Sequence, residues 1–496
     1  MVWCYPARMH RKRAYSGPMT TDRPSNVRPA TPLWGHETEL ALSNFTVSGR
    51  ALPLEIVHAL AAIKADAAVV NGAEWIAENS SEHRESENRE SEAGRAAAIA
   101  RFAAIAVAAS QVESGRYDDQ FLIDIFQTGS GTSTNMNVNE VVANLASASS
   151  GLTVHPNDHV NFGQSSNDTF PTAVTVAAVV QITHALLPAV SRLTDSMDTA
   201  AARFASVVKS GRTHMMDAVP VFLGDEFDGY AEQLREASER LAGALPRIGR
   251  VPLGGTAVGS GLNTSPRFGA DVIARISTRF GVDLSIAPSR FAAQASRDGL
   301  VEASGHLRGL AVALIKIAND IRLMGSGPAT GLGEIRLPEL QAGSSIMPGK
   351  VNPVMCEMVT QVAIQVIGND AAIAFAGSQG AFELNTYQPM MAANLIDSIG
   401  LLTRACTLFA ERCVDGIEAD IGRCAFYAGA TLALATTLNG TLGYDRVSEV
   451  VKAAVAQRRS LLDIVTEAAL LDPADAAALL DPATVARGNR GDRRND

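Results

Sequence analysis

Residues 299–324 read GLVEASGHLRGLAVALIKIANDIRLM, and the fold can be inferred outward from them. Their large apolar residues step along the chain by three, four, three and four positions, at Leu307, Leu310, Leu314, Ile317 and Ile321. This spacing places the five side chains on one stripe of an α-helix, as packing in a helix bundle requires. A helix of this length extends roughly 40 Å at 1.5 Å per residue.

Three other stretches have the same long, apolar pattern, at residues 170–208, 225–245 and 354–375. Asn167 or Asp168 is placed to cap the first of them. Together the stretches predict a mainly α protein with a long central helix bundle. Because the apolar surface of such a bundle exceeds what one chain covers, we expect the chain to form oligomers through it.

The composition is that of a large globular protein, with 496 residues, 47% of them hydrophobic. A net charge of −10 without a basic face argues against nucleic acid or acidic membranes as partners. No apolar run approaches the roughly 20 residues that span a bilayer, so we expect no membrane segment. Five cysteines without CxxC spacing predict neither a disulfide framework nor a metal site, and a reducing, cytoplasmic location fits them.

Two segments look irregular. Residues 1–36 are rich in proline and arginine and are expected to be a disordered tail. Residues 78–92 repeat Glu and Ser without an apolar face, which predicts a solvated helix or a disordered insert. We assign no function to either.

Four loops rich in hydrogen-bond donors lie at the ends of expected helices. They are TGSGTSTNMN at 128–137, GQSSND at 163–168, GRTH at 211–214 and GSSIMPGKVNP at 343–353. Helix N-termini favour carboxylates through their free N–H groups and dipole. With Lys350 as a cation and His214 beside a hydroxyl and an arginine, the loops predict a site for a small dicarboxylate. The glycine-rich run at 254–261 lacks the Lys-Thr ending of a phosphate loop and is interpreted as a turn, and no cofactor motif is present.

In chain order, these clusters resemble the class II fumarate hydratases of the fumarase/aspartase superfamily over about residues 33–445. The resemblance is carried by residues 130–140, 155–161, 165–173, 211–220, 254–263 and 343–353. It implies three domains after the tail: an N-terminal α domain at 37–164, the long-helix bundle at 165–421 and a small C-terminal α domain at 422–496. It also implies a homotetramer whose core is the shared bundle, with each active site drawing loops from three subunits.

The activity implied by the resemblance is reversible hydration of fumarate to L-malate in the tricarboxylic acid cycle, by a hydro-lyase without cofactor or metal. Addition and elimination are anti and pass through a carbanion, the aci-carboxylate. The implied catalytic residues are Ser344 as base, His214 for the water and leaving hydroxyl, Glu357 to orient His214, and Lys350. The implied substrate-binding residues are Ser130, Thr132, Ser165, Ser166, Asn167, Thr213, Lys350 and Asn352. A second dicarboxylate site is implied at His155, Asn157 and Asp158.

Two alternatives differ in residues that can be checked in the sequence. An aspartate ammonia-lyase typically has Thr-Gln and Ser-Thr where this chain has Thr213-His214 and Ser165-Ser166. A catalytically silent helical scaffold would be free to lose Ser344, His214, Lys350 and Asn352, and the chain retains all four. The departures from the family pattern, WGHET at 34–38 and LGDE at 223–226, change no residue assigned to catalysis.

Overall fold

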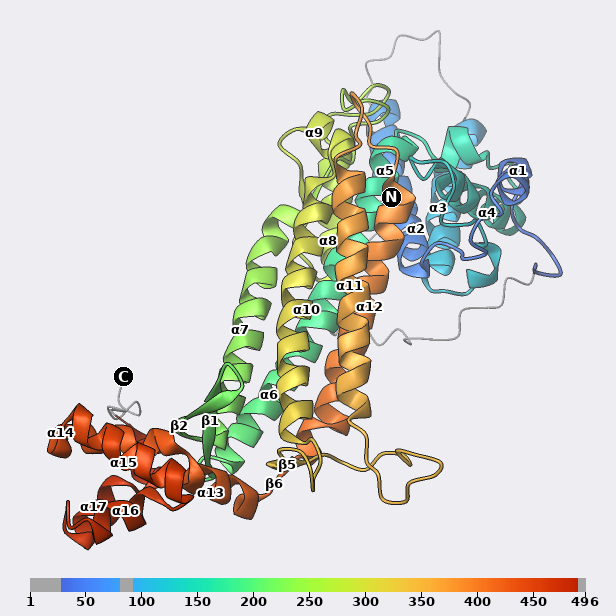
Figure 1. The fold of residues 1–496 in the computed structure, drawn as a ribbon. Coiled ribbons are helices and arrows are strands. Elements are labelled where there is room, and N and C mark those ends of the chain that lie inside the picture. The colour runs from blue at the N-terminus through green and yellow to red at the C-terminus, as the bar shows by residue number, and fades with distance from the viewer. Residues whose placement is uncertain (1–27, 81–91, 489–496) are drawn as a thin grey trace. The chain divides into compact units, whose positions relative to one another are not determined.

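The computed structural model describes residues 28–80 and 92–488, which form helices α1 to α18 and the short strands β1 to β6 (Figure 1). Most of the predicted tail, and residues 81–91 of the predicted insert, lie outside the described residues. The mainly α fold is confirmed. The chain divides into two compact units: unit 1 comprises Met1–Leu186, Gly243–Gly305 and Asn369–Gly400, and unit 2 comprises Leu187–Ala242, His306–Gly368 and Leu401–Asp496. The three predicted domains stay a prediction.

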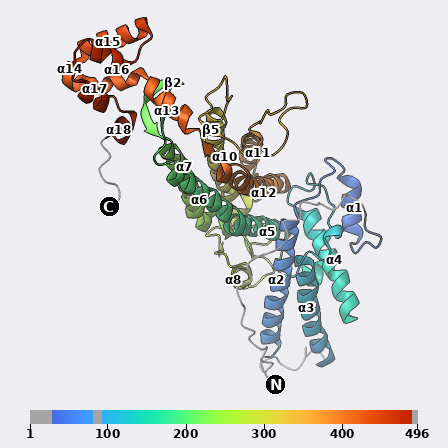
Figure 2. The same cartoon turned by 90° about the horizontal axis from the view of Figure 1, so that it is seen from below.

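Unit 1 is built around α2, whose side chains Ile56, Leu60 and Ile63 are fully buried at helical spacing. Helices α3, α5 and α8 pack on α2, and α4 packs on α3, so that α2, α3 and α4 lie side by side (Figure 2). The elements of this unit include α1 (His36–Asn44), α2 (Leu54–Ser80), α3 (Glu92–Glu113), η1 (Asp118–Gln120), α4 (Thr132–Ser150), η2 (Pro156–Val160), α5 (Ser166–Gln181), η3 (Ile182–Leu186), β3 (Arg250–Val251), α8 (Phe268–Phe280), β4 (Ser285–Ile286) and α9 (Arg290–Ala295).

One buried ion-pair cluster joins α2 to α8. The carboxylate of Asp66 is buried and accepts hydrogen bonds from Arg275 and Arg279 at 2.9–3.0 Å. Arg279 also binds Glu113 of α3 at 2.7 Å. The cluster fixes α8 against α2, because removing one partner would leave a buried charge uncompensated.

Unit 2 contains an antiparallel hairpin of β1 (Val208–Thr213) and β2 (Met216–Phe222), with a register irregularity between Ser210 and Arg212. Helix α13 packs on β1, and α18 packs on β2. The other elements of this unit are α6 (Leu187–Arg203), β5 (Ile335–Arg336), η4 (Val414–Gly416), β6 (Glu418–Ala419), α13 (Ile421–Ala430), η5 (Leu432–Leu438), α14 (Asn439–Leu442), α15 (Tyr444–Gln457), α16 (Leu461–Glu467), α17 (Pro473–Leu479) and α18 (Pro482–Arg487).

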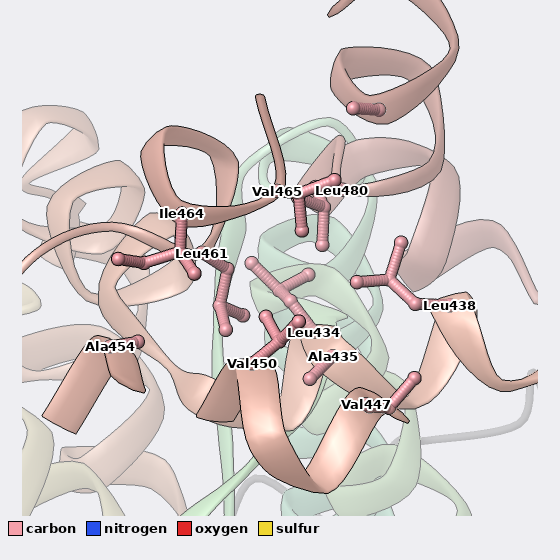
Figure 3. Packing of buried hydrophobic residues seen from close by; sticks show 11 residues of the cluster. Leu434, Ala435, Leu438, Val447, Val450, Ala454, Leu461, Ile464, Val465 and Leu480 are labelled. Atoms are coloured by element: carbon pink, nitrogen blue, oxygen red, sulfur yellow. The ribbon is translucent and has the colours of Figure 1, made fainter. Parts of the chain in front are cut away.

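The C-terminal part of unit 2 has its own apolar core (Figure 3). Leu438 of η5, Val450 of α15 and Val465 of α16 are buried in it, together with Leu480 after α17. Burying such side chains contributes roughly 1.5–3 kcal/mol each. This core holds the short helices of the C-terminal region together.

Four long helices contribute residues to both units: α7 (Leu223–Ile248), α10 (Asp298–Met324), α11 (Val354–Gly377) and α12 (Gln388–Arg412). All five apolar residues of the predicted stripe on α10 are at most 2% exposed, which confirms the stripe. The stretch predicted as one helix at 170–208 differs: it is α5, the π-helical turn η3 and α6. Its first helix has Ser165 as the N-cap residue, and Asp168 takes part in the cap by accepting from the N–H of Ser165.

The sequence-based expectation of no membrane-length apolar run needs a correction. Among the described residues, four helical stretches are long and apolar enough to cross a membrane: Leu54–Ala77, Gly94–Glu113, Ser166–Arg203 and Val354–Gly377. In Leu54–Ala77, 83% of the apolar window is buried inside the protein. Its alanines and valines therefore pack inside the protein. The stretch is rich in alanine, which is why the sequence analysis did not count it as an apolar run of membrane-spanning length.

Candidate active site

The start of α5 carries three of the predicted substrate-binding residues in a row. The hydroxyl of Ser165 accepts a hydrogen bond from the N–H of Asn167 at 3.2 Å, and the carboxylate of Asp168 accepts one from the N–H of Ser165 at 2.9 Å. This reciprocal capping box fixes the first turn of the helix. The turn thus presents Ser165, Ser166 and Asn167 at a helix N-terminus, where an anion is favoured.

Asp168 also holds the glycine-rich run against this turn. Its second carboxylate oxygen accepts hydrogen bonds from the N–H groups of Gly254 and Thr256, both at 2.9 Å, and Asn167 donates its side-chain amide to the carbonyl of Ala257 at 2.8 Å. Burial raises the pKa of Asp168, while these hydrogen bonds act in the opposite direction. The segment interpreted as a plain turn therefore supports the predicted site.

A buried polar network lies behind Ser166. The amide of Asn135 donates to the hydroxyl of Ser166 at 2.9 Å and to the side-chain oxygen of Asn161 at 3.3 Å. The ammonium of Lys64 donates to that same oxygen at 2.8 Å and to the side-chain oxygen of Gln164 at 3.0 Å. Burial lowers the pKa of Lys64 to about 7. Sequence reasoning missed Lys64, because a lysine inside an apolar helix pattern looks like one on a solvated face.

The loop before α4 brings Ser130 and Thr132 together, with their hydroxyl oxygens 2.7 Å apart. Gly131 between them has φ 77°, in the left-handed region. A side chain there would also collide with Phe170, since a Cβ would lie 2.3 Å from its ring. The glycine lets the two hydroxyls sit at the start of the helix.

The predicted second dicarboxylate site lies on the π-helical turn η2. His155 caps this turn, and its Nδ1 accepts from the N–H of Asp158 at 3.2 Å. The side chains of His155, Asn157 and Asp158 are exposed. Burial, and then the charge of Arg101, lower the pKa of the neighbouring His159. The structure thus brings the three predicted residues together on one exposed turn.

The loop at 343–353 closes on itself. The N–H of Gly343 donates to the carbonyl of Lys350 at 2.9 Å, and the amide of Asn352 donates to the carbonyl of Gly343 at 2.8 Å. No side chain fits at Gly343, because a Cβ would lie 2.1 Å from the Lys350 carbonyl oxygen. Asn352 therefore uses one amide N–H to close the loop, and the Lys350 side chain is exposed outside it.

Within this loop, the hydroxyl oxygen of Ser344 accepts two backbone hydrogen bonds, from Ile346 at 3.2 Å and from Met347 at 3.1 Å. Two N–H donors on one oxygen stabilise negative charge on it, as in an oxyanion hole. The Ser344 side chain remains partly exposed. The geometry therefore suits a serine that gives up its proton and takes another.

Thr213 and His214 lie at the tip of the β1–β2 hairpin, where a small-residue turn was expected. His214 and Met215 form the two-residue turn, with φ 56° and 64°, and both are exposed. Such turns need two left-handed residues because that twist matches the strands. The pairing partner of β1 lies in the following residues, which is why the isolated GRTH motif did not predict a hairpin.

Strand β1 of this hairpin is held by buried charges along its length. Arg212 donates to both oxygens of Glu334 at 2.9 Å, and the buried ammonium of Lys209 donates to Glu226 at 2.7 Å. Burial raises the pKa of Glu226. These pairs anchor the strand that carries Thr213 and the following histidine.

The predicted residues divide between the two units. Unit 1 carries Ser130, Thr132, Ser165, Ser166, Asn167 and the η2 residues, and unit 2 carries Thr213, His214, Ser344, Lys350, Asn352 and Glu357. Glu357 is exposed in the first turn of α11, and within the described chain no hydrogen bond or ion pair joins it to His214. Residues 28–80 and 92–488 contain no group of three or more His, Cys, Asp or Glu side chains that could hold a metal ion.

Comparison with known proteins identifies the family of the chain. The family described as Lyase matches residues 26–368, and the family described as Fumarase C C-terminus matches residues 434–487. A fumarate hydratase class II of Mycobacterium tuberculosis is 50% identical over 440 residues, covering 88% of each chain. One from Thermosynechococcus vestitus is 44% identical over 454 residues, covering 88% of this chain and 91% of the relative.

Among solved structures, a recombinant class II fumarase from Schistosoma mansoni superimposes with a TM-score of 0.85 at 37% identity, covering 92% of this chain and 96% of that one. The fold and the family match therefore define a lyase. Within the lyases, the chain belongs to the class II fumarate hydratase family.

Proposed function

We propose that this protein catalyses the reversible, stereospecific hydration of fumarate to L-malate, as a hydro-lyase of the tricarboxylic acid cycle. The observation that carries the proposal is the geometry of Ser344, whose oxygen accepts two N–H groups of its own loop in a chain of this family. Addition and elimination are anti and proceed through a carbanion, the aci-carboxylate. No metal or cofactor takes part, a proposal that rests on the family resemblance.

In the malate-to-fumarate direction, Ser344 takes a proton from C3, and the electron pair of that C–H bond passes into the adjacent carboxylate. The N–H groups of Ile346 and Met347 stabilise the serine oxyanion that accepts the proton. The electron pair then returns from the carboxylate to form the C2–C3 double bond, while the hydroxyl at C2 leaves with its bonding electrons and receives a proton from His214, so that water is released. Glu357 orients His214 in the assembled enzyme, a role that rests on the family resemblance, since no hydrogen bond or ion pair joins the two within the described residues.

Substrate carboxylates are held by two sets of donors. Lys350 and Asn352 bind one carboxylate, and Asn352 also donates to the Gly343 carbonyl, which keeps the loop closed. The other set comprises Ser130, Thr132, Ser165, Ser166, Asn167 and Thr213. The helix N-terminus of α5 adds its dipole to this second set. His155, Asn157 and Asp158 form a second dicarboxylate site on η2.

The active site is completed by association of four chains in the cytoplasm, with each site drawing residues from three subunits. Exposure supports this: the His214 tip and the Lys350 side chain are open to solvent in one chain. The long helix α11 also exposes Ile364 and Phe375, which are 64% and 72% exposed. Such apolar side chains on a helix face mark an interface. Neither nucleic acid nor a membrane is a partner.

The test is ultraviolet-monitored interconversion of malate and fumarate by the purified protein with a chelator present, run beside fumarate plus ammonium. Hydration that persists with the chelator is expected. Formation of aspartate would instead assign an ammonia-lyase. Silence in both assays would mean that the chain acts on another substrate or serves as a scaffold.

A further inference from the structure

Lys64 is a fully buried lysine on α2 that does not meet a carboxylate. Within the described residues, its ammonium forms no ion pair and instead donates to the side-chain oxygens of Asn161 and Gln164, at 2.8 and 3.0 Å. Burying a lysine in this way is costly, since its pKa falls to about 7. A buried lysine with this cost is expected to have a function. The hydrogen-bond network that starts at Lys64 ends at Ser166, a predicted substrate-binding residue.

The hydrogen-bond directions in this network follow from Lys64 and from the carbonyl of Gln164, which accepts from the NH2 group of Asn161 at 3.2 Å. An ammonium has only donors, so the group of Asn161 that faces Lys64 must be its oxygen. Asn135 approaches the same oxygen at 3.3 Å and must therefore present its NH2 group there. That NH2 group also contacts the Ser166 hydroxyl oxygen at 2.9 Å, so the oxygen of Ser166 accepts. The hydroxyl hydrogen of Ser166 is then left for another acceptor.

We propose that Lys64 is a positioning residue of the dicarboxylate site: through Asn161 and Asn135 it fixes Ser166 as a hydrogen-bond donor to a substrate carboxylate. The inference rests on the proposed function, because it concerns the acidic substrate of that site. Lys64 does not touch the substrate. A neutral lysine amine still has two N–H donors, so the directions persist when the proton is lost.

A second feature of the network shows that these directions are imposed. Among residues 28–80 and 92–488, the buried side-chain oxygen of Asn135 has no hydrogen-bond partner. A buried acceptor left unpaired is unfavourable, so an isolated Asn135 would not be held this way round. The orientation of the Asn135 amide is explained if its NH2 group must donate to both the Asn161 oxygen and the Ser166 oxygen.

The main experiment replaces Lys64 by methionine and measures KM and kcat for malate and fumarate. Lys64→Met removes the donor to the Asn161 oxygen and leaves the Asn161 amide held by the Gln164 carbonyl. The amides of Asn161 and Asn135 are then less firmly oriented, and we expect KM to rise roughly ten- to hundred-fold, the value of one hydrogen bond to a charged group. We expect kcat to change far less, because the donor binds substrate and transition state alike. Asp66→Asn is the matched control: it removes another buried charge of α2 outside the network and should leave KM unchanged.

A double-mutant cycle separates positioning from general damage. In a Ser166→Ala background, Lys64→Met should add little, because the donor that it positions is already gone. Independent, multiplicative effects on KM would overturn the inference. If Lys64→Met does not fold, Asn135→Asp tests the same idea: it keeps the shape, replaces the donating amide by an acceptor, and should raise KM similarly. An unchanged KM in that variant would also overturn it.

Binding of succinate, a dicarboxylate with no double bond to hydrate, distinguishes this inference from the proposed function. Calorimetry on the intact wild-type and variant proteins should show weaker succinate binding in Lys64→Met by a factor similar to the change in KM. A wild-type protein that binds succinate without hydrating fumarate would contradict the proposed function alone. Equal succinate affinity in wild type and Lys64→Met would contradict the positioning role alone.

Discussion

Ser344 carries the proposed proton transfer through a single oxygen atom, so its replacement is the most direct test at the residue scale. Ser344→Ala removes that oxygen and keeps the loop hydrogen bonds between Gly343, Lys350 and Asn352. We expect kcat to fall by roughly a thousandfold or more, as for the loss of a catalytic group, with assembly unchanged. Steady-state assays and gel filtration measure the two quantities.

Ser345→Ala is the control for this variant, because Ser345 is the exposed neighbour and has no assigned role. It should keep nearly full activity. Activity retained in Ser344→Ala at the level of this control would remove the serine from the role of base.

Lys64 also predicts a dependence of stability on pH. Its pKa is lowered from 10.5 to about 7 by burial, whereas the unfolded chain keeps the usual value. Between these two pH values the unfolded state binds more protons than the folded state. The free energy of unfolding therefore gains a contribution that increases as the pH rises from about 7 towards 10.5. Below pH 7 both states are protonated, and the folded state bears the full cost of the buried charge.

The expected result concerns the difference between wild type and Lys64→Met. The free energy of unfolding of Lys64→Met minus that of wild type should be greatest near pH 6. This difference should fall by roughly 2–3 kcal/mol between pH 7 and 9, at about 1.4 kcal/mol per pH unit, because the wild type gains stability over this range. Urea unfolding at several pH values measures this trend. A difference that does not vary with pH would mean that Lys64 keeps an ordinary pKa in the folded protein.

At the scale of elements, Asp168 joins the first turn of α5 to the glycine-rich loop. Its carboxylate accepts from the N–H groups of Ser165, Gly254 and Thr256. Asp168→Asn replaces one of the two accepting carboxylate oxygens by an NH2 group, which donates. We expect the free energy of unfolding to fall by roughly 2–4 kcal/mol, because buried N–H groups lose their acceptor. Thermal or denaturant unfolding measures it.

The same substitution at an exposed carboxylate provides the comparison. Asp271 in the first turn of α8 pairs with Arg267, whose side chain is largely exposed. Asp271→Asn should change stability by at most about 0.5 kcal/mol. Similar losses in both variants would show that Asp168 owes its effect to helix-terminal charge and not to the loop that it holds.

The elements that sequence reasoning predicted well are those whose signal is local. The helix predicted at 299–324 is α10, and the one predicted at 354–375 is α11, since apolar periodicity reports a helix directly. The hairpin at Thr213 and His214 was missed because the GRTH motif was considered without the residues that directly follow it, Met216–Phe222, with which β1 pairs. The network of Lys64 and the contact of Asp168 with the glycine-rich loop were missed for a different reason: the partners are distant in sequence, and burial of a charge leaves no periodic pattern.

At the scale of the whole molecule, exposed apolar side chains predict association. Ile364 and Phe375 of α11 and Val312 of α10 are all more than half exposed in the single chain. Covering them is favourable by about 25 cal/mol per Å² of apolar surface. We expect gel filtration with light scattering to give the mass of about four chains, in keeping with closed symmetry. A stable monomer with full activity would contradict the shared active site.

Mixing two inactive variants tests whether the site is shared between subunits. Ser344→Ala removes a unit 2 residue, and Asn167→Leu removes a unit 1 residue, so each pure variant should be inactive. If every site takes these two residues from different chains, random tetramers formed by co-expression contain some sites with both residues intact. With equal amounts of each chain, recovery should approach about a quarter of the wild-type activity. No recovery, in tetramers shown by mass spectrometry to be mixed, would place both residues of each site in the same chain.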